Sequence, residues 1–206
     1  MAETPITLIL LLLNVLVSGY ALLGNQDVIQ RFSFRPTLIL GSRQYYRLIT
    51  AGFVHVGFGH LLFNMITLYF FGPPMEMILG SVPFLGLYFG SELAAHGLSL
   101  VLQRNNPHYA AIGASGAISG VLFGYCLFRP FDSIYVMLIP IGIPAILFAV
   151  GYVVLSMYAM QHGRDRGVSG GIAHEAHLGG AVGGLILTIL LEPRVVPHFL
   201  EQIGIG

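Results

Sequence analysis

The sequence predicts an all-α membrane protein, a single domain over residues 1–206 that contains six transmembrane helices. Composition is the first reason, because 55% of the residues are hydrophobic and only 9% are charged, whereas soluble domains carry about 25% charged residues. Length is the second, because one bilayer crossing takes roughly 20 mostly apolar residues, which leaves little room for a soluble domain. The third is that the apolar residues fall into six segments along the chain.

These apolar segments are separated by connections that carry arginine, proline or asparagine. They lie at about 6–23, 53–72, 77–103, 111–128, 133–160 and 173–191. No basic residue precedes the first segment and no clear small-x-small cleavage site follows it, so we expect a retained helix rather than a signal sequence. The longest connection, about 24–52, mixes arginines with aromatic residues and is expected to lie partly in the membrane interface.

Prolines predict where two of these helices are interrupted. Pro73 and Pro74 are expected to end the second helix sharply, because proline lacks the backbone N–H that continues the hydrogen-bond ladder. Pro140 and Pro144 interrupt the fifth segment. We therefore expect the fifth helix to be bent or to begin late.

Charge argues against one large class of partners. The nine cationic residues are all arginine, and nine acidic residues balance them. No basic surface is then available to hold nucleic acid electrostatically, so nucleic acid is not an expected partner. The single cysteine, Cys126, lies in an apolar glycine-rich stretch and is predicted to be a packing residue.

Glycines at helical spacing predict which helices pack closely. In the fourth segment Gly116, Gly120 and Gly124 lie four residues apart, as Gly180 and Gly184 do in the sixth. This spacing places each set on one helix face, where the missing side chains let two backbones approach closely. Polar residues beside the two faces are therefore expected to meet.

Polar side chains inside hydrocarbon are costly, so each one is a functional candidate. The candidates are His55, His60, Asn64, Glu92, His96, Ser115, Ser119, His174, Glu175 and His177.

Ser115 and His177 are the predicted catalytic pair. Ser115 lies in the run Gly113-Ala114-Ser115-Gly116, whose small residues leave its hydroxyl unshielded. Alone this signal is weak, because a serine in a transmembrane helix usually bonds its own backbone. His177, however, is followed by Gly180 and lies on or beside the glycine face of the sixth segment. A serine and a histidine in one dry interface are the minimum for base-assisted nucleophilic attack.

His60 and Asn64 are candidates for stabilising an oxyanion. They lie one helical turn apart, and both offer N–H donors without adding a permanent charge. As an isolated pair they would more often form interhelical hydrogen bonds. Beside Ser115 and His177 they supply the third part of an acyl-transfer site.

Taken together, and in their order along the chain, these motifs resemble the rhomboid family of intramembrane serine proteases. The resemblance covers the chain from about Tyr46 to Gly184. The resemblance rests on a set of short motifs that are common singly and specific together. They are Tyr46-Arg47, His55, His60-x-x-x-Asn64, Gly113-Ala114-Ser115-Gly116, and Ala176-His177-x-x-Gly180-x-x-x-Gly184.

The resemblance implies a six-helix rhomboid-like bundle that cleaves transmembrane or membrane-anchored proteins near the membrane surface. Its site would be a Ser115–His177 dyad without a third acid. The oxyanion hole would comprise His60, Asn64 and the main-chain N–H of Ser115. Arg47 and Glu76 match positions of structural support, and no metal or organic cofactor is implied. The absence of a transit-like start favours a bacterial inner membrane; the oligomeric state is not predicted.

The chain departs from the family pattern in one side chain and in its charge distribution. Many members place an aromatic residue one turn after the nucleophile, where this chain has Ser119, so His177 is expected to be held differently. The usual bacterial orientation leaves only Arg129 and Arg194 inside, whereas the positive-inside rule favours the opposite orientation. The arginines placed outside are Arg31, Arg35, Arg43, Arg47, Arg104, Arg164 and Arg166.

Two other classes of function stay open at this stage. One is a metal or ion transporter with His55, His60, His174 and His177 as ligands. The zinc-protease pattern needs two histidines four residues apart, whereas His174 and His177 are three apart. The other is an inactive relative that binds transmembrane clients, although such proteins normally lack the serine or the histidine.

Overall fold

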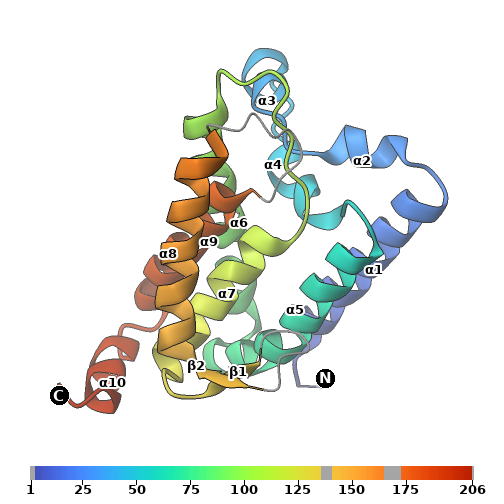
Figure 1. The fold of residues 1–206 in the computed structure, drawn as a ribbon. Coiled ribbons are helices and arrows are strands. Elements are labelled where there is room, and N and C mark those ends of the chain that lie inside the picture. Colours follow the sequence, from blue (N-terminus) through green and yellow to red (C-terminus); the bar gives the residue numbers. More distant parts are fainter. Residues whose placement is uncertain (1–2, 136–140, 165–172, 206) are drawn as a thin grey trace.

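The computed structural model describes residues 3–135, 141–164 and 173–205, and it is mostly helical (Figure 1). Its elements follow one another along the chain. They are α1 (Pro5–Leu23), α2 (Asp27–Phe32), α3 (Pro36–Ser42), α4 (Arg47–Thr50), the 3₁₀ helix η1 (Ala51–Phe53), α5 (Phe58–Leu79), α6 (Ser81–Gln103), α7 (Ser115–Phe128), β1 (Ser133–Tyr135), β2 (Gly142–Pro144), α8 (Ala145–Arg164), α9 (His174–Leu191) and α10 (Val195–Gln202).

Four of the described helices, α1, α5, α6 and α9, are long and apolar enough to cross a membrane. Helix α7 and the apolar part of α8 (Ala145–Tyr158) are shorter. The predicted class, a helical membrane bundle, is confirmed, while the number of six crossings stays a prediction. Helices α6, α7 and α9 pack at the centre, with α1 and α5 along one side and α8 along another (Figure 1). The short helices α2, α3 and α4 lie at the end of the bundle opposite both chain termini.

The prediction that Pro73 and Pro74 end the second helix is wrong. Helix α5 continues through both prolines to Leu79 and ends at Gly80, whose φ is +84°. A proline ring accepts helical φ angles, and its cost of about 3 kcal/mol can be offset by packing around it. Here Gly72, Met75 and Glu76 next to the prolines are all buried. Because α5 is longer than expected, α6 begins at Ser81 instead of residue 77.

Three other helix starts also differ from the sequence expectation. Helix α5 begins at Phe58 instead of residue 53, because Ala51–Phe53 forms the separate 3₁₀ turn η1. Helix α7 begins at Ser115 instead of residue 111, because Gly113 has φ +114°, which an α-helix cannot include. In the fifth segment the chain forms an antiparallel β1–β2 hairpin before α8 begins at Ala145.

The late start of α8 confirms one of the two expectations for the fifth helix. Pro144 closes β2 directly before the helix, and proline suits that place because it cannot donate to a preceding turn. Pro140 lies outside the described residues, so its predicted effect stays a prediction.

Two ionic side chains, Glu76 and Arg47, each join neighbouring segments of the chain. The Glu76 carboxylate accepts hydrogen bonds from the amides of Ile6 and Thr7, at 2.9 and 2.7 Å, and from the hydroxyl of Ser81 at 2.7 Å. It thereby places a negative charge at the amino end of α1, where the helix dipole favours it. Arg47 is buried and donates from Nη1 to the carbonyls of Gln30 and Ser33, at 2.9 and 2.7 Å.

The two glycine faces expected from the sequence pack against each other where α7 crosses α9. A Cβ atom on Gly180 would clash with the carbonyl oxygen of Gly116, and one on Gly184 would clash with the backbone of Gly120. The backbones are therefore in direct contact at two levels, one helical turn apart. Any side chain at these positions would push the helices apart.

We expect Gly180→Ala to lower the free energy of unfolding by about 1–3 kcal/mol, the usual range for overpacking. Gly86→Ala in α6 is the matched control, because a Cβ there meets nothing within 4 Å and alanine is the better helix former. Unfolding in mixed micelles with a rising fraction of dodecyl sulfate would measure both variants. Equal stability of the two would contradict the close approach at Gly180.

Candidate active site

The chain leading into α7 holds Ser115 at the first residue of that helix. Gly113 adopts φ +114°, in the left-handed region that glycine accepts readily, and its amide donates to the Ala51 carbonyl at 2.9 Å. The amide of Ala114 donates to His55 Nε2 at 3.4 Å. Two residues of the stretch between α4 and α5 thus fix the backbone directly before Ser115.

His55 forms this contact as a neutral imidazole. Its Nδ1 lies 2.7 Å from the hydroxyl of Ser18, which itself donates to the Phe53 carbonyl at 2.9 Å. The bonding pattern therefore assigns the proton to Nδ1 and leaves Nε2 as the acceptor for the Ala114 amide.

The structure brings Ser115 and His177 into hydrogen-bond contact. Ser115 Oγ and His177 Nε2 are 2.7 Å apart, although the residues are 62 positions apart in the sequence. His177 lies in the first turn of α9, three residues before the glycine that contacts Gly116. Both side chains are half-buried.

The neighbours of His177 on α9 lie differently. The ring of His174 is 6.4 Å from the ring of His177, centre to centre, and meets it edge-on. Glu175 is buried, and its Oε1 accepts a hydrogen bond from Gln103 Nε2 on α6 at 3.1 Å. The Glu175 carboxylate therefore has a hydrogen-bond partner on α6.

His60 and Asn64 lie on α5, beside the start of α7. A Cβ on Gly113 would be 2.5 Å from His60 Cε1, so the imidazole packs directly on the backbone that leads to Ser115. The rings of His55 and His60 meet edge-on with centres 5.0 Å apart. Asn64 is buried, and its side-chain amide donates to the carbonyl of His60 at 3.1 Å. That bond occupies one of the two amide protons.

Glu92 is a buried carboxylic residue whose place in the site the sequence did not reveal. Its Oε2 accepts a hydrogen bond from the amide of Ala117, in the first turn of α7, at 3.0 Å. Its Oε1 lies 3.5 Å from His96 Nε2. Glu92 therefore satisfies one of the free amides at the amino end of α7. Its only sequence signal was an ionisable side chain inside an apolar segment.

Tyr152 is a second residue that sequence reasoning missed. It comes from α8, and its ring stacks on that of His177 with centres 6.2 Å apart and planes 27° apart. Its hydroxyl shares a hydrogen bond with Ser119 Oγ at 3.0 Å. The occurrence of Ser119 where an aromatic residue was expected was the one hint that another ring would be needed.

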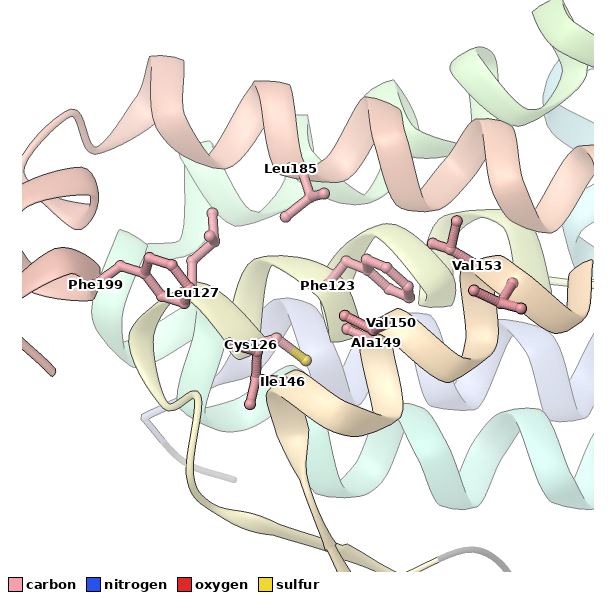
Figure 2. A pocket seen from close by; sticks show the side chains of 10 residues that line it. Phe123, Cys126, Leu127, Ile146, Ala149, Val150, Val153, Leu185 and Phe199 are labelled. Carbon is pink, nitrogen blue, oxygen red and sulfur yellow. The ribbon is translucent and has the colours of Figure 1, made fainter. Parts of the chain in front are cut away.

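An apolar cavity of about 340 Å³ lies between α7 and α8, further along α7 from Ser115 (Figure 2). Phe123 and Cys126 of α7 face Ala149 and Val153 of α8 across it. Leu185 of α9 closes one side. Cys126 is thus a packing residue in this wall, as its surroundings in the sequence suggested.

A seryl hydroxyl bonded to an imidazole, at the start of a helix within a membrane bundle, is an arrangement suited to acyl transfer. A model of the rhomboid domain matches residues 42–194, and the chain belongs to the rhomboid family.

Curated relatives with protease names match much of the chain. It is 30% identical to the rhomboid protease GlpG of Haemophilus influenzae, over 89% of this chain and 89% of GlpG. It is 37% identical to the putative rhomboid protease YdcA of Bacillus subtilis, over 60% of this chain and 61% of YdcA. The rhomboid protease GluP of the same species is 29% identical over 85% of this chain, which spans only 35% of GluP.

We expect Glu92→Ala to lower the free energy of unfolding by about 1–3 kcal/mol, because the amide of Ala117 would lose its acceptor. Glu92→Gln has nearly the same volume and keeps an acceptor oxygen, so its loss should be clearly smaller. Thermal unfolding of both variants in detergent would measure the difference. Equal losses would show that volume, not the bond to α7, is what Glu92 contributes.

Proposed function

We propose that this chain is an intramembrane serine endopeptidase with Ser115 as the nucleophile and His177 as its general base. One observation carries the proposal, namely the 2.7 Å contact between Ser115 Oγ and His177 Nε2. This distance lies within the range in which an imidazole can take the proton of a hydroxyl during attack. The protease names of the relatives support the same reaction class.

The proposed reaction uses His177 twice. As Ser115 Oγ attacks the carbonyl carbon of the scissile bond, Nε2 takes the hydroxyl proton and the imidazole becomes positively charged. That proton then passes to the leaving amine as the C–N bond breaks, which leaves an acyl group on Ser115. A water molecule then attacks the acyl carbon while it gives a proton to the same nitrogen. As the bond between the acyl carbon and Ser115 Oγ breaks, that proton passes to Oγ, which releases the acid product and restores the hydroxyl.

The negative charge that develops on the carbonyl oxygen needs fixed donors nearby. The main-chain N–H of Ser115 lies in the first turn of α7, where amides have no partner inside the helix and the helix dipole is positive. His60 packs against Gly113 beside this turn, and Asn64 lies one turn further along α5. We assign these three groups to the oxyanion hole.

The proposed substrates are transmembrane or membrane-anchored proteins in the same bilayer. A peptide bond inside a helix is hydrogen-bonded and shielded, so the substrate must unwind locally before Ser115 can attack it. Helix α7 has 14 residues and is about 21 Å long, less than the roughly 30 Å thickness of the hydrocarbon core. Ser115 at its first residue therefore suits cleavage at some depth below the surface. We place the protein in a bacterial inner membrane.

The metal-site alternative draws no support from the described side chains. Where the structure describes the side chains, no three of histidine, cysteine, aspartate or glutamate are grouped to hold a metal ion. An inactive client-binding relative is distinguished from a protease by the reactivity of Ser115 itself.

We expect Ser115→Ala and His177→Ala each to lower cleavage by at least about 10³-fold, because each removes one half of the dyad. His174→Ala is the matched control and should change cleavage only modestly. The assay is cleavage of a model transmembrane substrate by purified protein, with a fluorophosphonate probe to label Ser115. Substantial cleavage by Ser115→Ala, or an inactive His174→Ala beside an active His177→Ala, would refute the assignment.

Loss of one main oxyanion donor costs about 10²–10³ in kcat, so a shared donor should cost less. We therefore expect Asn64→Ala to lower kcat by less than that range, and His60→Ala to be at least as harmful. Steady-state kinetics on the same substrate would measure both. If both variants kept full kcat, α5 would contribute only packing.

A further inference from the structure

The ring of Tyr152, on α8, stacks on the imidazole of His177, the proposed base. We propose that Tyr152 positions the His177 imidazole for its reaction with Ser115, and that Ser119 holds Tyr152 in place. This inference rests on the proposed function, since it concerns the same dyad. Tyr152 is assigned no contact with the substrate, so its role is to position the base.

The first argument is the way in which the tyrosine is held. Ser119 lies one turn after Ser115 on α7 and is buried, with 6% of its surface exposed. The bond between its hydroxyl and that of Tyr152 therefore joins α7 to α8 one turn from the nucleophile. Phe123 meets the Tyr152 ring edge-on with centres 5.5 Å apart, and Phe148 lies 6.0 Å from it. The ring is thus fixed by one polar and two aromatic neighbours.

The second argument is what the imidazole needs. A bond of 2.7 Å to Ser115 requires a narrow range of ring orientations, and small misplacements of reacting groups can cost large factors in rate. In many serine hydrolases a carboxylate orients the histidine. Here the nearby Glu175 carboxylate bonds to Gln103 on α6. Stacking on Tyr152, at 27° between planes, restrains the imidazole from its face.

The third argument is the cavity next to Tyr152. Between Ile146 and Val154, the side chains of α8 that face α7 line an apolar cavity (Figure 2). That wall offers the tyrosine no polar partner. The bond to Ser119 is then the polar interaction that, together with the two aromatic contacts, holds the ring over His177.

The experiment compares Tyr152→Leu, Tyr152→Phe, Ser119→Ala and the double variant Tyr152→Phe/Ser119→Ala. Phe148→Leu is the matched control, because it removes another ring of α8, one that lies tilted against Tyr152, and leaves the ring that stacks on His177 in place. For each we would measure kcat and KM on the transmembrane substrate, the rate of fluorophosphonate labelling of Ser115, and thermal unfolding.

We expect Tyr152→Leu to lower kcat and the labelling rate together, by about tenfold, with KM within about twofold of wild type. Tyr152→Phe keeps the ring and should lose about threefold, as should Ser119→Ala. The double variant should match the single ones, because both remove the same bond. Phe148→Leu leaves the Tyr152 ring and its bond to Ser119 in place, so its loss of kcat should be clearly smaller than that of Tyr152→Leu.

Two results would overturn the inference while leaving the proposed function intact. One is wild-type kcat and labelling in Tyr152→Leu when wild type is active and Ser115→Ala is not. The other is an equal loss in Phe148→Leu, which would assign the effect to general packing of α8. A wild-type protein that neither cleaves nor labels would instead refute the proposed function, and this inference with it.

Discussion

The close approach of α7 and α9 is the constraint on which the rest of the molecule depends. In lipid, helices gain little from burying apolar surface, so association depends on close van der Waals contact between backbones. Gly116 against Gly180, and Gly120 against Gly184, provide that contact at two levels. Ser115 directly precedes the first pair on α7, and His177 lies one turn before it on α9. The same packing that joins the helices therefore determines the distance between the two side chains.

A second constraint is that α7 begins inside the bundle. Backbone at membrane depth must find hydrogen-bond partners within the protein, since lipid offers none. Partners come from two parts of the chain. Gly113 donates to Ala51 and Ala114 donates to His55, both in the stretch before α5, while Ala117 donates to Glu92 of α6. His55 and Glu92 are costly residues in an apolar protein, and they lie on either side of the first turn of α7. These hydrogen bonds explain why the two polar residues lie inside the bundle, without assigning either of them a catalytic role.

The sequence predicted the parts of this arrangement that depend on local pattern. Hydropathy identified the helical segments, and the four-residue glycine spacing indicated which faces pack. The errors arose where tertiary contacts outweigh local preference. Pro73 and Pro74 disfavour a helix, but the buried residues around them and the bonds of Glu76 to α1 keep α5 continuous. The start of α7 depends on the positive φ of Gly113, which the sequence permits without requiring.

The pairing of Ser119 with Tyr152 lay beyond local pattern for a different reason. The two residues are 33 positions apart, on helices joined through a hairpin, and no pattern in the sequence indicates that they are in contact. What the sequence did show was a small side chain on α7 at a place close to the base. A small residue there leaves space beside the imidazole, and dense packing requires that another helix fill it. Helix α8 fills it with Tyr152, whose apolar ring covers His177 while its hydroxyl satisfies Ser119. The side chain that seemed to be missing from α7 is thus supplied, in both size and polarity, from α8.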